Sequence, residues 1–169
     1  MSLREVITYP HPLLRKRSQP VKAVNNEVLR LIEDMADTMY AQRGVGLAAV
    51  QIGVHQRVIT IDVGEGLLAM INPEVLERSG ETQMEEGCLC LPGVIVEVER
   101  SERVTVRGLN EKGEEVTLPA EGLLARALQH EIEHLDGILI VDKVSRLKRE
   151  LLTGKLRKEA KERAAARKS

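Results

Sequence analysis

The chain has 169 residues, and only two of them, Tyr9 and Tyr40, are aromatic. This length fits a single domain, residues 1–169, whose core Leu, Ile, Val, Met and Ala must fill because Phe and Trp are absent. The formal net charge is −1, and the near absence of aromatic side chains argues against a protein that stacks the bases of single-stranded nucleic acid.

Charge is distributed unevenly along the chain. Residues 145–169 carry ten Lys or Arg against three Glu, whereas the preceding 144 residues carry 15 basic and 23 acidic side chains. The first residues are not followed by the apolar stretch of a signal peptide, and no apolar run approaches the roughly 18 residues that span a membrane. We therefore expect a cytoplasmic protein with no membrane partner.

The first part of the chain predicts an irregular start followed by a helix. Three prolines indicate an irregular, partly extended segment over residues 5–22. Apolar residues at helical spacing predict a helix over about residues 25–42, capped by Asn25 or Asn26. A loop rich in small residues, Gly44–Gln51, follows.

The middle of the chain predicts β-structure. Short apolar runs and alternating apolar and charged residues indicate strands at residues 58–63, 67–71, 94–99, 103–109 and 115–118. Asn72 and Pro73 should stop the second of these strands. The last two should form a hairpin through the turn at residues 110–113.

The last part predicts two more helices. One covers about residues 121–136 and should stop at Gly137. The other covers about residues 145–165 and carries a narrow apolar stripe of Leu147, Leu151, Leu152 and Leu156. The order of elements predicts an α+β fold, with antiparallel strands packed around a central helix and with a C-terminal helix.

The strongest chemical signal is the pentad His130-Glu131-Ile132-Glu133-His134 on the predicted central helix. Residues four apart share a helix face, so both imidazoles can reach one metal ion while Glu131 moves protons on a bound water. The alternative is a chance match on a solvated helix face. The pattern favours metal-assisted hydrolysis, but it does not name the substrate.

A third metal ligand must come from elsewhere in the chain. A catalytic zinc-type site takes three protein ligands and leaves one position for water. No third His follows the pentad, as it would in a metzincin, and Asp142 and Glu150 are the first acidic candidates after Asp136. Upstream, Cys88 offers a thiol next to Gly87, and a thiolate binds such a metal well.

Three segments of the chain together resemble the three sequence motifs of peptide deformylase: Gly44–Gln51, Glu86–Leu89 and Gln129–Gly137. They occur in the family's order and at comparable separations, and Tyr9–Arg15 also resembles the family's N-terminal segment. Each motif alone is weak, whereas the three together are highly specific. The resemblance implies removal of the N-terminal formyl group from newly made polypeptides that begin with formyl-methionine.

The resemblance also implies a metal and its ligands. Cys88, His130 and His134 would hold one divalent ion per chain, typically Fe²⁺ in the cell, although Zn²⁺, Ni²⁺ or Co²⁺ can occupy such a site. Metal-bound water or hydroxide would attack the formyl carbon and release formate. Glu131 would act as general base and then general acid.

Two further groups would stabilise the reacting oxygen in a member of this family. The side-chain amide of Gln51 and the backbone N–H of Leu89 would donate hydrogen bonds to the formyl oxygen, on which negative charge develops. Without the other motifs, the plainer interpretation of Gln51 is a turn cap.

The remaining substrate-binding positions implied by the resemblance are Gly44, Val45, Gly46, Met84, Glu86, Gly87, Leu123 and Ala127. The glycines would let backbone approach the substrate and the metal. The apolar members are also plausible core residues, and an unbranched methionine side chain needs an aliphatic pocket. Arg126 departs from this pattern, because some members of the family place an apolar residue near the pocket there.

Cys90 is a second departure, because the family more often has Ser at this position. On an extended segment Cys88 and Cys90 point to the same face, so they could join His130 and His134 in a closed, structural Cys₂His₂ site. Such a site needs no Glu131, and we predict that Cys90 is not a ligand. A zincin-like metallopeptidase is the other alternative, and the missing third His disfavours it.

The basic segment at about residues 145–169 suits an acidic partner. The other interpretation is a solvated helix that docks through its leucine stripe. Some bacterial deformylases use a C-terminal helix for ribosome binding, so the resemblance allows contact with ribosomal RNA. Such contact should weaken steeply with salt.

Overall fold

The computed structural model describes residues 2–168, which form three α-helices, three short 3₁₀-helices and seven β-strands. The helices are α1 (Asn26–Ala41), α2 (Gly122–Leu135) and α3 (Arg146–Lys168), with η1 (Pro12–Arg15), η2 (Ala49–Ile52) and η3 (Ile140–Lys143). The strands are β1 (Gly46–Ala48), β2 (Val58–Ile61), β3 (Leu68–Ser79), β4 (Thr82–Cys88), β5 (Leu91–Arg100), β6 (Arg103–Leu109) and β7 (Glu115–Glu121).

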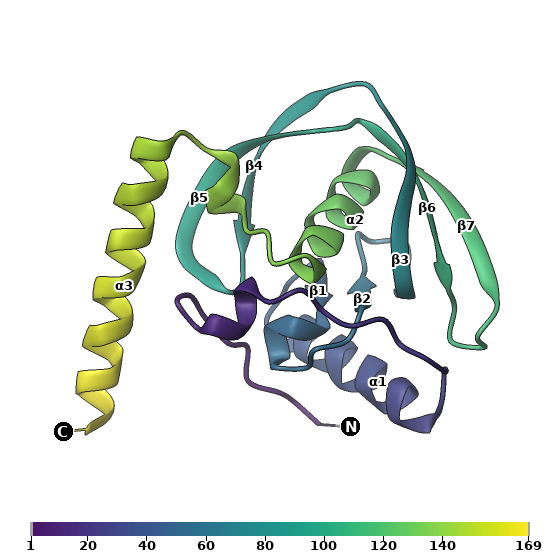
Figure 1. Cartoon of the computed structure of the whole chain (residues 1–169), viewed down its shortest axis with the longest axis horizontal. Coiled ribbons are helices and arrows are strands. Elements are labelled where there is room, and N and C mark those ends of the chain that lie inside the picture. Colours follow the sequence, from purple (N-terminus) through teal and green to yellow (C-terminus); the bar gives the residue numbers. More distant parts are fainter. Residues whose placement is uncertain (1, 169) are drawn as a thin grey trace.

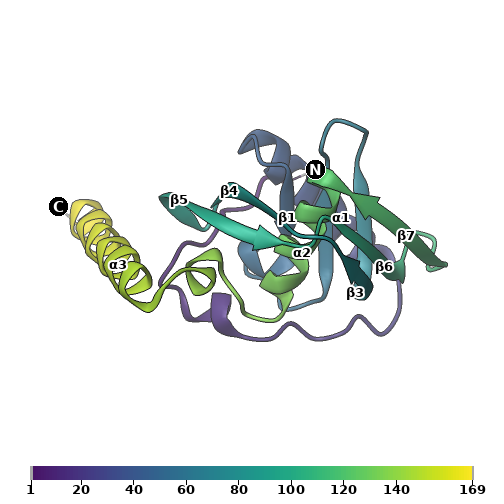
Figure 2. The same ribbon diagram turned by 90° about the horizontal axis from the view of Figure 1, so that it is seen from above.

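The strands form two antiparallel sheets on either side of α2. One sheet has the order β1-β2-β3-β6-β7, and the other pairs β4 with β5. Figures 1 and 2 show α2 in the middle of the molecule, with β4 and β5 on one side and β3, β6 and β7 on the other. The predicted α+β fold with antiparallel strands around a central helix is confirmed.

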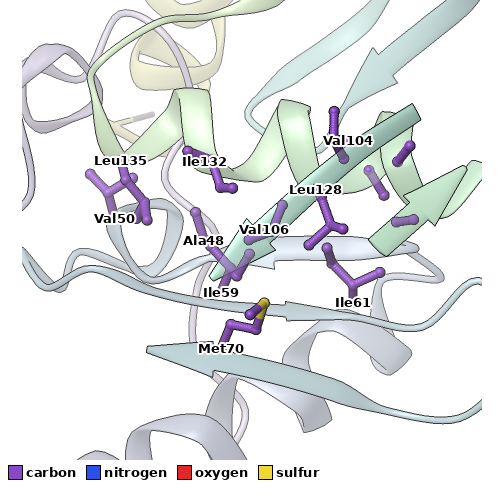
Figure 3. Packing of buried hydrophobic residues seen from close by; sticks show 13 residues of the cluster. Ala48, Val50, Ile59, Ile61, Met70, Val104, Val106, Leu128, Ile132 and Leu135 are labelled. Atoms are coloured by element: carbon purple, nitrogen blue, oxygen red, sulfur yellow. The ribbon is translucent and has the colours of Figure 1, made fainter. Parts of the chain in front are cut away.

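The helix α2 is central because its apolar face packs on the five-stranded sheet. Its residues Leu128, Ile132 and Leu135 are buried against side chains from β2, β3 and β6, including Ile59 and Val106 (Figure 3). This contact leaves the histidine-bearing part of α2 facing β4. The core here is aliphatic, as the composition requires.

The helix α1 covers the opposite face of β1 and β2. Asn25 caps it by accepting a hydrogen bond from the Val28 backbone N–H at 3.1 Å. Met35 and Met39 are fully buried in a cluster that includes Val58 of β2. Alternate residues of β2 therefore face α1 and α2, which fixes the glycine-rich segment before β2 next to the central helix.

Several strand boundaries differ from the sequence-based predictions. β3 does not stop at Asn72 but continues to Ser79, because a register shift between Ile71 and Glu74 accommodates Pro73. The segment Gly44–Gln51, predicted as loop, contains β1 and most of η2. β2 ends at Ile61 rather than residue 63.

Two further strands, β4 and β7, also differ from the sequence-based predictions. β4 was not predicted at all, because Glu86 is its one buried residue and no alternation marks it. β7 extends through Pro119 to Glu121. This proline is tolerated because β7 lies at the edge of its sheet.

The C-terminal helix α3 stands at one side of the molecule (Figures 1 and 2). It contacts β5 and η3 through half of its leucine stripe, since Leu156 is buried and Leu152 is half-buried in the cluster beneath it. Leu147 and Leu151 are 69% and 67% exposed. Among residues 2–168, no helix combines the length and apolar character needed to cross a bilayer.

Candidate metal centre and active site

The end of β4 brings Cys88 against the two histidines of α2. Cys88 Sγ lies 3.1 Å from His134 Nε2, which lies 3.2 Å from His130 Nε2. All three donor atoms lie within 4.8 Å of one another. Donors at 2.0–2.3 Å from one ion, at tetrahedral angles, are about 3.3–3.5 Å apart. The set therefore has the chemistry and spacing to hold one transition-metal ion.

Cys90 lies beside this set but outside it. Its Sγ is 3.2 Å from Cys88 Sγ. Among the described residues, the donor atoms that gather within 4.8 Å come from Cys88, His130 and His134 and not from Cys90. This geometry favours a site with three protein donors over a closed Cys₂His₂ site.

The surroundings favour the charged form of the Cys88 sulfur. The hydrogen bond with Cys90 and the proximity of His134 and His130 lower the pKa of Cys88 well below its usual value, although burial opposes this. The same contact with Cys88, together with burial, raises the pKa of Cys90. Of the two cysteines, Cys88 is thus the one suited to bind a cation.

A buried ion network holds His130 in place. His130 Nδ1 donates to Glu86 Oε1 at 2.9 Å, and Arg100 donates to both oxygens of Glu86 at 2.7 and 2.9 Å. Burial would raise the pKa of Glu86, but the hydrogen bonds from His130 and Arg100 lower it to about 2. An ionised Glu86 fixes the His130 ring so that Nε2 faces the other donors.

The same network accounts for Arg126. Its guanidinium donates to Glu86, to the Val98 carbonyl at 3.1 Å and to the Thr82 carbonyl at 3.0 Å. Arg126 lines the cavity beside the site, but its guanidinium bonds to these buried partners, of which Glu86 carries the opposite charge. The pocket therefore keeps its apolar character despite an arginine in its wall.

The glycine-rich segment places Gln51 beside the donor set. Gln51 is buried in η2, and its Oε1 accepts a hydrogen bond from the Ala48 backbone N–H at 2.8 Å. This contact fixes the amide so that Nε2 points to Cys88 Sγ at 3.5 Å. The side chain thus presents a donor to the cavity rather than an acceptor.

Glu131 lies in the same site with one free carboxylate oxygen. Its Oε1 is buried and has no hydrogen-bond partner among the described residues. Burial raises the pKa of Glu131 above its usual value, with His130 and His134 opposing this. Gly46 packs against the carboxylate so closely that a Cβ there would lie 2.6 Å from Glu131 Oε2.

These groups line one cavity of ≈ 460 Å³. Its walls contain every residue predicted for metal binding, catalysis or substrate binding except His134, namely Gly44, Val45, Gly46, Gln51, Met84, Glu86, Gly87, Cys88, Leu89, Leu123, Ala127, His130 and Glu131. His134 completes the donor set next to His130. The structure thus brings together residues that are far apart in the sequence.

The sequence-based prediction missed Ile95 in the cavity wall, which is 64% exposed. Together with the half-exposed Val45, Met84 and Leu123, it forms an exposed apolar rim around the cavity. A signal for it exists in β5, where Val94, Val96 and Val98 face the core. An exposed apolar residue on the outward face of such a strand indicates a binding surface.

Comparisons of the whole chain with known proteins point to one family. A sequence model of the family described as polypeptide deformylase matches residues 3–150. The peptide deformylase of Carboxydothermus hydrogenoformans is 54% identical over 149 residues, which cover 88% of this chain and 98% of that protein. The peptide deformylase of Thermodesulfovibrio yellowstonii is 46% identical over 162 residues, covering 93% and 98%.

Solved structures are similar over almost the whole chain. The peptide deformylase of Legionella pneumophila superposes with a TM-score of 0.90 at 43% identity, covering 96% of this chain and 98% of that one. The peptide deformylase of Ehrlichia chaffeensis in complex with actinonin gives a TM-score of 0.91 at 37% identity, covering 94% and 98%. With these similarities and the donor set on α2 and β4, the chain belongs to the polypeptide deformylase family and is a metal-dependent hydrolase.

Proposed function

We propose that this enzyme removes the formyl group from N-formyl-methionyl nascent polypeptides in the cytoplasm and releases formate, with residues 1–169 acting as one catalytic domain. The observation that carries the proposal is the meeting of three metal donors, a buried carboxylate and a side-chain amide in one apolar cavity. A formyl group is the smallest acyl group, so it suits a reaction centre that the chain surrounds closely.

Cys88, His130 and His134 would hold one divalent ion. Two imidazoles and a thiolate suit several first-row ions, and availability decides among them. We propose Fe²⁺ in the cell, with Zn²⁺, Ni²⁺ or Co²⁺ as possible replacements. When bound, such an ion supplies Lewis-acid activation of water, whose pKa it can lower to about 7.

Glu131 would move the protons of the reaction. Its unpartnered Oε1 is positioned to take a proton from the attacking water and to pass it to the departing amine. A raised pKa suits a group that must accept and then release a proton near neutral pH. Gly46 leaves the space that the carboxylate occupies.

Gln51 and Leu89 would stabilise the oxygen of the formyl group. The Ala48 N–H fixes the Gln51 amide so that its Nε2 can donate, and the backbone N–H of Leu89 would be the second donor. Donors fixed before the reaction act mainly on the charge that develops in the transition state, and the loss of one typically costs ~10²–10³ in rate.

The apolar rim would bind the methionine side chain. Val45, Met84, Leu123 and Ala127 line the cavity and offer the aliphatic surface that an unbranched thioether needs. Gly44 and Gly87 would let backbone approach the substrate, and Glu86 would contribute through His130. Because the cavity opens at this rim, the rest of the polypeptide can extend into solvent.

Formate release from formyl-Met-Ala-Ser tests the proposal. We expect activity in the wild-type enzyme and a loss of at least ~10²-fold in Glu131→Gln, with metal content unchanged, because only the proton-transfer group is altered. Cleavage of internal peptide bonds would instead support a zincin-like peptidase. An inactive protein that unfolds on metal removal would support a structural site. Metal analysis of anaerobically purified enzyme identifies the ion.

We also propose that α3 contacts the ribosome. The helix carries most of the basic tail, and its exposed Leu147 and Leu151 leave part of the stripe uncovered. Removal of residues 146–169, which leaves η3 in place, should abolish co-sedimentation with ribosomes at low salt while formate release from a short peptide persists. Unchanged co-sedimentation would contradict the contact.

A further inference from the structure

Cys90 contacts the Cys88 sulfur although a three-donor site does not need it. The two Sγ atoms are 3.2 Å apart, and these are the only cysteines of the chain. Cys88 lines the cavity, whereas Cys90 is 0% exposed and packs with Leu91 and Val94 in the cluster under β5. A small molecule that enters the cavity can therefore contact Cys88 but not Cys90, whose thiol is buried next to the Cys88 sulfur.

The local backbone permits a bond between the two sulfurs. A disulfide needs an S–S separation of about 2.05 Å, so the sulfurs must approach by about 1.1 Å. Cα atoms two residues apart are at most about 7 Å apart when extended, and the turn at Leu89 and Cys90 shortens this span toward the usual disulfide range. A register shift between Gly87 and Cys88 already interrupts the β4–β5 ladder at this point.

We propose that Cys88 and Cys90 form a redox-active pair that a hydroperoxide converts to an intrachain disulfide when no metal is bound. The Cys88 sulfur attacks the O–O bond of hydrogen peroxide, which gives a sulfenic acid and one water. The Cys90 sulfur then displaces the hydroxyl from the Cys88 sulfur, which forms the S–S bond and releases a second water. Two thiols are oxidised by two electrons, and one peroxide is reduced to two waters.

The second thiol makes the oxidation reversible. A sulfenic acid without a neighbouring thiol proceeds to sulfinic and sulfonic acids, which thiol reductants do not reverse. The disulfide removes the thiolate that would bind the metal, but a reductant restores both thiols. The competition between disulfide formation and metal binding rests on the proposed role of Cys88 as a metal ligand. Formation of the disulfide itself does not rest on that role.

Intact-mass measurement of the full chain tests the pair. The metal-free enzyme is treated with hydrogen peroxide, the free thiols are alkylated, and Zn²⁺ uptake is measured before and after dithiothreitol. We expect a mass lower by two hydrogens, loss of both alkylation sites, and Zn²⁺ uptake that dithiothreitol restores. The matched variant Cys90→Ser should instead gain oxygens at Cys88, with no recovery. Cys90→Ala serves the same comparison if Ser is not tolerated in the buried position.

The outcomes separate this inference from the proposed function. Added oxygens in the wild-type protein, a disulfide between chains, or equal recovery of the Cys90 variants would overturn the pair. Zn²⁺ bound before the peroxide should protect both thiols, because it occupies the Cys88 sulfur. A disulfide that forms equally fast with Zn²⁺ present would leave the pair standing and overturn Cys88 as a ligand.

Discussion

Gly46 sets the position of the Glu131 carboxylate, because nothing larger than hydrogen fits between them. In Gly46→Ala the added Cβ would lie 2.6 Å from Glu131 Oε2, so the carboxylate must move. A displacement of about 1 Å at a catalytic group can cost ~10²-fold in rate. We expect a loss of that order in formate release, with Zn²⁺ uptake retained because the three atoms nearest to the added Cβ all belong to Glu131 and not to a metal donor.

The same change in open space provides the control for Gly46. Gly154 lies in α3, and a Cβ there would meet no atom within 4 Å. Gly154→Ala should leave formate release unchanged and stabilise the helix by up to ~1 kcal/mol. Wild-type turnover in Gly46→Ala would show that the Glu131 carboxylate need not lie where this glycine allows it.

Glu86 acts on the metal through His130, and its removal should weaken metal binding. In Glu86→Gln the ionised acceptor that fixes the His130 ring at 2.9 Å is lost. Changes of this kind typically cost 10–100-fold in metal affinity. Competition between the enzyme and a coloured chelator for Zn²⁺ measures the loss. Glu85→Gln, its exposed neighbour on β4, is the control, and equal affinities in the two variants would contradict the role.

At the scale of single residues, spacing along the chain predicted the two histidine donors, but it could not predict which residues surround them in the fold. The four-residue spacing of His130 and His134 requires only a helix, so it is visible in the sequence. The bonds of Arg126 to the carbonyls of Thr82 and Val98 depend on how β4 and β5 meet α2. No spacing along the chain carries that information, and Arg126 therefore looked like a departure from an apolar pocket.

At the scale of elements, the docking of α3 depends on one buried leucine. Leu156 is buried in the cluster that also contains Tyr9, and Arg157 donates to the Tyr9 hydroxyl at 3.1 Å. Leu156→Ala should weaken the docking of α3 by about 2 kcal/mol. This value is at the lower end of the losses measured for buried Leu→Ala changes, because the contact between α3 and the rest of the fold is small. Hydrogen exchange in α3 should then be up to ~30-fold faster. The exposed Leu151→Ala should change nothing, and equal effects would contradict this docking.

A charged contact joins the N-terminal segment to η3 and should make stability depend on pH. Arg15 donates to both oxygens of Asp142 at 2.5 and 3.1 Å. Burial raises the pKa of Asp142, but the Arg15 bonds and the Leu139 N–H outweigh it, so that the pKa lies below its usual value. A lowered folded-state pKa gives stability that is present above the unfolded value, about 3.9, and is lost as pH falls through the folded value.

Asp142→Asn tests this contact. The wild type should be more stable than the variant at neutral pH, and the difference should shrink below about pH 4, where the unfolded chain begins to take up the proton. Urea unfolding at a series of pH values measures it. When Arg15 is replaced by Met, the effect of Asp142→Asn on the free energy of unfolding should be smaller at every pH above about 4. A difference independent of pH would mean that charge is not the cause.

The same elements show what local sequence can and cannot predict. The spacing of Met35 and Met39 predicted α1 to within a residue or two, because one helix face meets the core. β4 escaped detection because it is exposed along most of its length and pairs only with β5. β3 continues past Pro73 through a register shift, and the Asn72 side chain beside it bonds the Val21 backbone at 2.8 and 2.9 Å, a partner 51 residues away.

At the scale of the whole molecule, the proposed metal joins two parts of the fold. Cys88 belongs to the two-stranded sheet, whereas His130 and His134 belong to the helix that packs on the five-stranded sheet. In the sequence, Cys88 lies more than 40 residues from either histidine. An ion that all three hold therefore favours the folded arrangement over the unfolded one.

Metal binding should accordingly raise the melting temperature of the enzyme. At a free ion concentration 100 times the dissociation constant, binding to the folded state alone adds about 2.7 kcal/mol. For a chain of this size that corresponds to roughly 5–10 °C. Calorimetry of the metal-free enzyme with and without Zn²⁺ measures the shift. Cys88→Ala should lose most of it and Cys90→Ala should keep it, because only Cys88 holds the ion. If Cys88→Ala gained as much as the wild type, the ion would be bound without the thiolate, and the sheet and helix would not be joined through it.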